Sequence, residues 1–302
     1  MNDEPVIRTR ALCKRYGRKM AIDHLDLVIE RGNIHAIVGA NGAGKSTLFR
    51  ILLGFMPATS GDASILGRDC RALTPADRER IGFVNEEHTL PGWMTVAAVT
   101  AMQRRLYRHW SQDAFDETIG HYNVLGGQKV SQLSRGERAG FNLALTLAQQ
   151  PELLVFDEPT LGLDVVAKRA FLETLLYSNA TRDCTVVYCS HQMEEIERVA
   201  DNLIIMERGA LRNMSPPDDF RARVSCWVAD IPFRGPDPRQ VPGLLEAQRI
   251  DGLHHYLVLD QGDDFAEFLR SCGARDVHAM PVSLDRAVNG FLAKHHAMPT
   301  AA

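Results

Sequence analysis

The sequence predicts an α/β fold with a mostly parallel sheet and an inserted helical segment, followed by a small α+β domain. Short continuous apolar runs alternate with stretches of helical spacing, as buried parallel strands alternate with helices; the runs are 34–38, 153–156, 185–189 and 203–206. A glycine-rich loop joins the first run to a helix-like segment. The chain has 302 residues, whereas single domains usually have about 100 to 200, so we expect two domains, 1–214 and 215–302.

The elements follow in order along the chain. Val6 to Ala11 and Leu25 to Ile29 are typical of short strands around a basic turn, and we expect an antiparallel flap. The segment 93–148 has helical spacing and few β-branched runs, which predicts a helical subdomain over about 88–148. Ser215-Pro216-Pro217 marks the domain boundary. Beyond it we expect strands and helices; the strands are 224–228 and 255–260, and the helices are 263–272 and 284–295.

The composition of the chain limits which partners and which cellular compartment we expect. The net charge of −4 and the pI near 6.3 give no global attraction to nucleic acid or to an anionic membrane, so we expect no nucleic-acid partner. The six cysteines contain no Cys-x-x-Cys pair, which disfavours a zinc site and a disulfide framework and suits a reducing compartment. The acidic N-terminus resembles no secretory signal, and no apolar run is long enough to cross a bilayer. We therefore expect a cytoplasmic location, with any membrane role depending on a partner.

A phosphate-binding loop is the strongest local signal. Glycines let backbone N–H groups close around phosphate oxygens, and the following helix directs its positive end at the anion. Lys45 is expected to reach the terminal phosphates of ATP or GTP, Ser46 to bind Mg²⁺, and Thr47 to lie beside the phosphates. A glycine-rich turn without function is the alternative, but strand, loop and helix occur in the required order. The loop is Gly39-Ala40-Asn41-Gly42-Ala43-Gly44-Lys45-Ser46-Thr47.

Two adjacent carboxylates end the apolar run 153–156. Asp157 is expected to support Mg²⁺, usually through water, and Glu158 to act as the base or orienting group for the attacking water. A solvated strand end is the alternative, and the upstream phosphate loop favours the catalytic interpretation.

Between these motifs, Ser134 and Glu137 have the spacing of a helix capping box. The helix that they open is expected to run through Phe141 and Leu147 and to stop before Pro151. Taken alone, this segment needs no role beyond capping.

Taken in order, these segments resemble the nucleotide-binding subunit of ABC (ATP-binding cassette) transporters over about the first 210 residues. The resemblance implies a P-loop ATPase core that binds ATP with Mg²⁺ and hydrolyses ATP. Tyr16 resembles the aromatic residue that stacks on adenine, a role for which a bland surface tyrosine is the alternative. The segment 133–137 resembles the family's signature, which is normally Leu-Ser-Gly-Gly-Gln. The segment 161–164, which ends in Asp164, resembles the loop at the family's dimer interface. His191 resembles the family's switch histidine, which contacts the γ-phosphate.

The resemblance also implies partners. In the family, two subunits meet so that the signature of one covers the γ-phosphate bound by the other. The resemblance implies that Ser134 and the Gly136 N–H of this chain take that position, so we expect a homodimer or a heterodimer of such subunits. ATP would hold the pair together, and hydrolysis by Glu158 with Lys45 and His191 would release it. The cycle would drive a separate transmembrane permease subunit from the inner face of the membrane. Tyr107 to Trp110 and the variant signature look closest to bacterial exporter-type subunits.

The sequence departs from the family at three places. Glu86 stands where the family has a glutamine, so it keeps an acceptor for Mg²⁺ or its water but loses the amide donor. Arg135 and Glu137 replace a glycine and a glutamine of the signature. The segment 86–110 falls where relatives contact their membrane subunit; Trp93 and Trp110 either make that contact or pack inside the helical subdomain.

Other functions remain open. A soluble ATPase of this family acting on ribosomes or nucleic acid is the main alternative, although those relatives usually carry two cassettes or long coiled coils. A nucleotide sensor without hydrolysis is disfavoured by Glu158 and His191. The pairs His254-His255 and His295-His296 are poor metal sites because adjacent side chains point apart. The tail from 215 onward suits either dimer contact or regulation.

Overall fold

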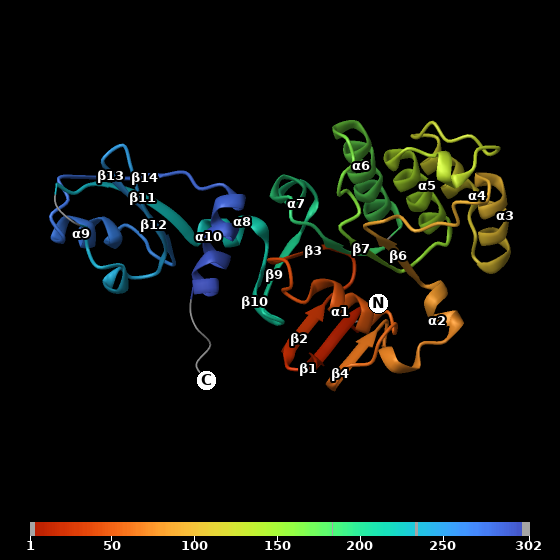
Figure 1. The fold of residues 1–302 in the computed structure, drawn as a ribbon, viewed down its shortest axis with the longest axis horizontal. Helices are drawn as coiled ribbons and strands as arrows, with labels where there is room; N and C mark the ends of the chain where they lie inside the picture. The colour runs from red at the N-terminus through yellow and green to blue at the C-terminus, as the bar shows by residue number, and fades with distance from the viewer. Residues whose placement is uncertain (1–3, 183, 233–234, 298–302) are drawn as a thin grey trace. The chain divides into compact units, whose positions relative to one another are not determined.

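The computed structural model describes residues 4–182, 184–232 and 235–297, and the chain forms two compact units (Figure 1). Unit 1 comprises Met1–His191 and Arg198–Met214, and unit 2 comprises Gln192–Glu197 and Ser215–Ala302. Among the described residues, no helix has the length and apolar character that crossing a membrane requires.

A six-stranded sheet forms the centre of unit 1. Its order is β10-β9-β3-β8-β7-β6, and β3 lies parallel to β8 and β9 while β7 lies parallel to β6 and β8. All residues of β3 and β8 are buried, which explains their unbroken apolar character. The predicted α/β fold is therefore confirmed. The strands are β3 Ile34–Val38, β6 Ile81–Asn85, β7 Leu153–Asp157, β8 Thr185–Cys189, β9 Asn202–Glu207 and β10 Ala210–Ser215.

An antiparallel sheet of order β2-β1-β4-β5 forms the predicted flap. Its first two strands are longer than predicted, because they continue to a two-residue turn at Gly17 and Arg18, and Gly17 has the positive φ of +57° that such a turn requires. Tyr16 consequently ends β1 and pairs with Lys19, rather than lying in a wide basic turn. The strands are β1 Ile7–Tyr16, β2 Lys19–Ile29, β4 Ser60–Ile65 and β5 Arg68–Asp69.

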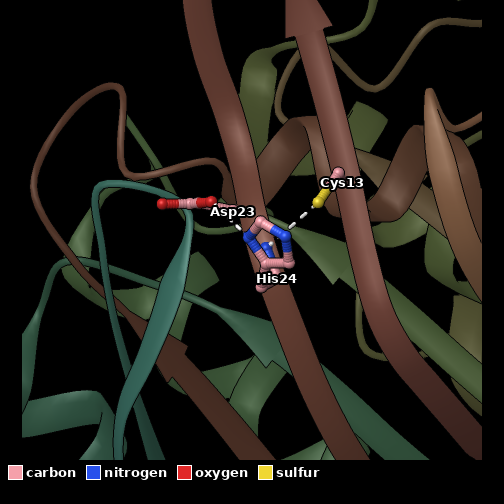
Figure 2. Close-up of side chains that lie close together, drawn as sticks. All are labelled: Cys13, Asp23 and His24. Atoms are coloured by element: carbon pink, nitrogen blue, oxygen red, sulfur yellow. Dashed lines mark hydrogen bonds and ion pairs between the residues drawn. The ribbon is translucent and has the colours of Figure 1, made fainter.

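A β-bulge interrupts the pairing of β1 with β2. Leu12 pairs with Leu25 and Lys14 pairs with Ile22, so the single residue Cys13 opposes two residues. These are Asp23 and His24, and His24 has a left-handed φ of +46°. A bulge redirects side chains that would otherwise alternate between the faces of a sheet. Figure 2 shows the three side chains together on the two strands.

Helices complete unit 1. Three of them, α3, α4 and α5, form the predicted helical subdomain and share an apolar core that includes Phe115 and Phe141 (Figure 1). Trp110 packs on this core, with its ring 5.6 Å from that of Phe115, so the packing interpretation holds for Trp110. The helices of the chain up to residue 199 are α1 Lys45–Leu52, α2 Pro75–Glu79, α3 Val96–Leu106, α4 Gln112–Ile119, α5 Arg135–Ala148, α6 Val165–Arg182 and α7 Met193–Val199, with 3₁₀ turns at Cys70–Ala72 and Val130–Gln132.

The described part of unit 2 contains an antiparallel sheet of order β12-β13-β11-β14, three helices beyond residue 215, and residues 193–197 of α7. The sequence did not indicate β12 and β14, because these edge strands are largely exposed and lack a regular apolar alternation. The side chains of His295 and His296 lie outside the described part. The elements are α8 Pro217–Ala222, β11 Val224–Asp230, a 3₁₀ turn Pro238–Gln240, β12 Leu244–Ile250, β13 Leu253–Leu259, α9 Asp264–Ser271, β14 Asp276–Met280 and α10 Leu284–Ala297.

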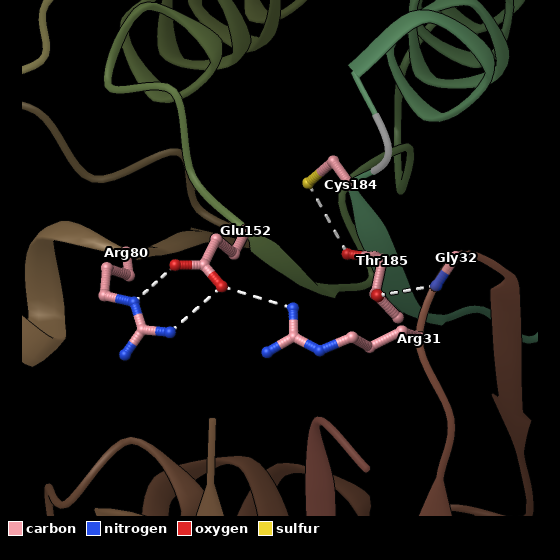
Figure 3. A network of polar contacts seen from close by, with 6 residues as sticks. All are labelled: Arg31, Gly32, Arg80, Glu152, Cys184 and Thr185. Carbon is pink, nitrogen blue, oxygen red and sulfur yellow. Dashed lines mark hydrogen bonds and ion pairs between the residues drawn. The ribbon is translucent and has the colours of Figure 1, made fainter. Parts of the chain in front are cut away.

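An ion network joins the amino ends of β3, β7 and β6 in the six-stranded sheet (Figure 3). Glu152, just before β7, accepts hydrogen bonds from Arg80, just before β6, and from Arg31, just before β3. The bonds from Arg80 hold the pKa of Glu152 below its ordinary value. This edge of the sheet is thus held by structural contacts.

Candidate nucleotide-binding and catalytic site

The parallel register brings the predicted motifs to the opposite, carboxyl edge of the sheet. Cys189 at the end of β8 is in register with Ile37 of β3 and with Asp157 at the end of β7, and Asp157 is in register with Asn85 at the end of β6. The segments that follow these strand ends therefore leave from one edge, where open α/β sheets bind ligands. They carry the phosphate loop 39–47, Glu86, Glu158 and His191.

The phosphate loop is closely packed, and its glycines are required. A Cβ on Gly44 would lie 2.4 Å from the carbonyl oxygen of Ala21, and one on Gly39 would lie 2.2 Å from that of Met206. Gly42 and Gly44 have positive φ angles of +84° and +105°. Among the described residues, no side chain caps the first turn of α1, whose N-cap is Gly44. The N–H groups of this turn are thus directed at the space above the loop.

Lys45 closes over the loop that carries it. Its Nζ donates to the carbonyl oxygens of Gly39 at 2.6 Å and Ala40 at 3.4 Å. Asn41, Gly42 and Ser46 are exposed, Thr47 is half-buried, and Ala43 is buried. A flexible ammonium group in this position can exchange the carbonyl oxygens for phosphate oxygens.

The tip of the β1–β2 hairpin lies beside the loop. A Cβ on Gly42 would be 3.9 Å from the Nζ of Lys19, the residue that pairs with Tyr16. The Tyr16 hydroxyl donates to the sulfur of Met56 at 3.0 Å, and Lys14 Nζ is 5.4 Å from the centre of its ring. Since the side chain is 44% exposed, a base above the loop has access to the ring.

We predict that Tyr16→Ala weakens Mg-ATP binding by about 1 to 3 kcal/mol, because base–aromatic stacking contributes that range. Stacking tolerates any base, so GTP should compete measurably with ATP. Isothermal titration calorimetry measures both effects. Tyr177→Ala, which removes an exposed tyrosine from α6, is the matched control and should bind ATP as the wild type does. Unchanged affinity in Tyr16→Ala would remove this residue from the site.

Glu158 and His191 contact each other at the carboxyl edge. The Glu158 N–H donates to the carbonyl oxygen of Cys189 at 3.0 Å, and the backbone of Glu158 has a left-handed φ of +52°. The carboxylate oxygen Oε2 lies 2.8 Å from His191 Nδ1. A carboxylate only accepts, so Nδ1 carries the hydrogen and Nε2 is left for another group. The Glu158 side chain is 16% exposed and that of His191 56% exposed.

Cys189 lies among the charged groups of the site. Burial raises the pKa of its thiol well above the ordinary value; the Lys45 ammonium acts in the opposite direction, and the carboxylates of Glu158 and Asp157 raise the pKa further. The thiol is therefore neutral at physiological pH. The same interactions place Lys45 and both carboxylates within electrostatic reach of one side chain.

The signature segment lies against the segment 161–167. Ser134 caps α5: its Oγ accepts from the Glu137 N–H at 3.2 Å, and Glu137 Oε2 accepts from the Ser134 N–H at 2.8 Å. The predicted capping box is thus confirmed, and the hydroxyl hydrogen of Ser134 is still able to reach an anion. A Cβ on Gly162 would be 2.4 Å from Arg135 Nη1.

Two further contacts complete this region. A Cβ on Gly136 would be 2.9 Å from the Ala167 Cβ, and Asp164 Oδ1 accepts from the Ala167 N–H at 2.9 Å. The signature and the 161–164 loop consequently form one packed surface within this chain.

His88 was not identified from the sequence, although it supports the site. Its ring is 1% exposed, and Nε2 lies 2.8 Å from the Pro159 carbonyl oxygen, one residue after Glu158. Glu86, two residues earlier, is exposed in the turn that follows β6. The ring thus joins this turn to the loop that carries Glu158. A single histidine in a polar stretch carries no sequence signal for such a contact.

We predict that His88 makes folding stability sensitive to mild acid. Burial lowers the pKa of His88 from 6.5 to about 4. Between these values the unfolded chain binds a proton that the folded chain excludes, so the free energy of unfolding should fall by about 3 kcal/mol as the pH decreases from 6.5 to 4. His88→Gln, which still offers a donor to Pro159, should lose this dependence. Urea unfolding across that range tests it. The control His278→Gln, at an exposed histidine, should keep the pH dependence of the free energy of unfolding. Equal pH profiles for His88→Gln and the wild type would contradict the prediction.

Comparison with known proteins agrees with this arrangement. A family model described as "ABC transporter" matches residues 22–161. The bacitracin transport ATP-binding protein BcrA of Bacillus licheniformis is 31% identical over 263 residues, covering 85% of this chain and 83% of that protein. A solved structure described as the ATP-binding subunit of an ABC transporter has a TM-score of 0.65 at 23% identity, covers 72% of this chain and 92% of that chain, and supports the fold.

The methionine import ATP-binding protein MetN of Lacticaseibacillus paracasei is 32% identical over 225 residues, which cover 70% of this chain and 64% of that protein. The chain thus spans less than two thirds of that relative's length. The similarity to BcrA extends over most of both proteins, and the order of strands, phosphate loop and helical subdomain agrees with it. The chain belongs to the ABC transporter family, among its ATP-binding proteins.

Proposed function

We propose that this chain is the ATP-hydrolysing subunit of an ABC transporter. The observation that carries the proposal is the 2.8 Å contact between Glu158 and His191 at the sheet edge that also bears the phosphate loop. The imidazole of His191 orients the carboxylate of Glu158, and the phosphate loop at the same edge can bind an anion. This arrangement is suited to activating a water molecule next to a bound triphosphate.

The proposed reaction assigns one role to each group. The backbone N–H groups of 42–47 and the Lys45 ammonium hold the phosphate oxygens. Glu158 accepts a proton from water while the water oxygen forms a bond to the γ-phosphorus, and the bond to the β–γ bridging oxygen breaks to leave ADP. His191 Nδ1 orients the Glu158 carboxylate, and Nε2 is directed to the γ-phosphate. Tyr16 stacks on the base.

Mg²⁺ suits the oxygen donors at this edge. Ser46 offers a hydroxyl, and Asp157 and Glu86 offer carboxylates, which are the hard ligands that Mg²⁺ prefers, usually with several waters retained. When bound, Mg²⁺ neutralises charge on the phosphate oxygens. Asp157 supports this role by its place at the end of β7, next to the loop that carries Glu158.

The proposed dimer gives the signature its function. Arg135 and Gly136, which follow Ser134, lie against 161–167 in their own chain, which suits a surface that meets another subunit. A second copy, or a homologous subunit, would present this surface and Asp164 to the bound γ-phosphate. ATP then favours the closed pair, and hydrolysis reverses that preference.

The membrane partner would bind at the loop that precedes α3. Trp93 is 79% exposed in this loop, and exposed tryptophan is enriched at protein interfaces. We propose that this contact places the chain at the inner face of the membrane, with 215–302 as an accessory domain for dimer contact or regulation. The net charge of −4 gives no support to the alternative on ribosomes or nucleic acid.

We predict that Lys45→Ala abolishes at least nine tenths of Mg-ATP hydrolysis by the purified chain, whereas Lys168→Ala on α6 leaves it unchanged, because Lys45 belongs to the phosphate loop and Lys168 lies outside it. The rate of phosphate release measures this effect.

We also expect the tagged chain to co-purify with a membrane-spanning protein from native membranes. Trp93→Ala should reduce the yield of that protein, whereas Leu125→Ala, at another exposed apolar site, should not. Hydrolysis that survives Lys45→Ala, or a chain that co-purifies with ribosomes instead, would refute the proposal.

A further inference from the structure

Three side chains of metal-binding types meet at the bulge between β1 and β2, and none of them belongs to the motifs already described. The Cys13 sulfur, a carboxylate oxygen of Asp23 and a ring nitrogen of His24 all lie within 4.8 Å of one another (Figure 2). Among the described residues, this is the one such group of three. The spacing of the cysteines along the chain disfavours a zinc site, but the fold supplies ligands other than cysteine.

The bulge is the reason that these residues meet. Adjacent strand residues ordinarily point to opposite faces, so Asp23 and His24 would point apart in regular pairing. Because one residue opposes two here and His24 has a φ of +46°, both side chains lie on the side of Cys13. Left-handed backbone at a histidine is unfavourable by about 1 to 3 kcal/mol, so the surrounding strand pairing must hold it in place.

The ligand set fits a borderline transition metal. Thiolate, imidazole and carboxylate all bind Zn²⁺, and three protein ligands leave a fourth position for water. Tetrahedral Zn²⁺ with bonds of about 2.0 to 2.3 Å brings its ligand atoms to roughly 3.5 Å from each other. Cys13 is 5% exposed and fixed in the sheet, whereas Asp23 and His24 are exposed. The two exposed side chains can therefore make the small movement that the geometry requires.

The existing contacts give the competing explanation. The backbone N–H of His24 donates to the Cys13 sulfur at 3.3 Å, and the ring Nδ1 of His24 lies 2.8 Å from Asp23 Oδ1. The carboxylate also orients the ring, as carboxylates do for metal-bound histidines. These bonds stabilise the bulge with or without a metal, so only a binding experiment separates the two explanations.

The bulge is connected to the phosphate loop. The Asp23 N–H donates to the Gly209 carbonyl oxygen at 3.0 Å, and the Gly209 N–H donates to the Ala43 carbonyl oxygen at 2.9 Å. Ala21, two residues before Asp23, is the residue whose carbonyl oxygen closely approaches Gly44. An ion that rigidifies the bulge would thus also restrain the loop.

We propose that Cys13, Asp23 and His24 form a binding site for Zn²⁺ or a similar borderline divalent ion, and that its occupancy alters nucleotide affinity through Gly209. Zn²⁺ binding replaces the thiol proton by a sulfur–metal bond, and the proton is released to solvent. The site itself does not depend on the proposed ATPase activity.

Co²⁺ titration of the full chain, without an affinity tag or nucleotide, tests the site. We expect one equivalent to produce the near-ultraviolet absorption of a thiolate–Co²⁺ bond, which Zn²⁺ then displaces. Cys13→Ser should lose the band, and His24→Gln should weaken binding at least tenfold. The controls Cys272→Ser and His278→Gln, in unit 2, should match the wild type. Circular dichroism verifies that each variant is folded.

Two results would overturn the proposal. One is the absence of a thiolate band in the wild type, and the other is a band that persists in Cys13→Ser or disappears in Cys272→Ser. The connection to the loop has its own measurement, because Zn²⁺ at saturating Mg²⁺ should change the Kd for ATP severalfold in the wild type but not in Cys13→Ser. An unchanged Kd would refute that connection.

Discussion

Glu158→Gln should bind Mg-ATP with nearly wild-type affinity and release phosphate at less than a tenth of the wild-type rate. The amide keeps the size and an oxygen that can accept from His191 Nδ1, which lies 2.8 Å from the carboxylate. It cannot take a proton from water, and general-base catalysis typically contributes a factor of about 10² to 10⁴. The loss should therefore appear in kcat, with KM little changed.

Steady-state phosphate release and equilibrium ATP binding test this together. Glu173→Gln, an exposed glutamate on α6 that pairs with Arg169 and Arg198, is the matched control and should hydrolyse ATP normally. If Glu158→Gln retains more than a tenth of the wild-type rate, another group orients the water. If it loses ATP binding as well, the contact of Glu158 with His191 is structural.

Ser134→Arg, made in the Glu158→Gln background, should abolish ATP-dependent dimerisation while leaving ATP binding to the monomer intact. Glu158→Gln alone should dimerise with Mg-ATP, because hydrolysis no longer dissolves the pair. The added arginine would occupy the position of the γ-phosphate held by the other subunit, whereas Lys45, Ser46 and Tyr16 are unchanged. Size-exclusion chromatography with Mg-ATP compares the single and double variants.

The loss of the helix cap needs a separate control. Ser134 caps α5, and removal of an N-cap costs about 1 kcal/mol. Ser111→Arg removes the cap of α4, away from the signature, and should still dimerise in the Glu158→Gln background. A folded Ser134→Arg double variant that dimerises with ATP would show that the segment only caps its helix.

The local features of this chain follow from its sequence because they depend on neighbouring residues. The glycines at 42 and 44 provide positive φ angles within one turn, and Ser134 and Glu137 satisfy each other's N–H groups three residues apart. Buried strands such as 34–38 and 185–189 are recognisable from their apolar runs. The α/β fold and the helical subdomain were predictable from such patterns, and the family resemblance from their order.

Tertiary structure alone decided the features that depend on register. His88 contacts Pro159, 71 residues away, and β12 and β14 are strands because β13 and β11 offer them hydrogen bonds. Cys13 opposes Asp23 and His24 only because the pairing of β1 with β2 shifts by one residue. Such a shift is set by the packing of the whole sheet, and a residue's nearest neighbours along the chain do not encode it.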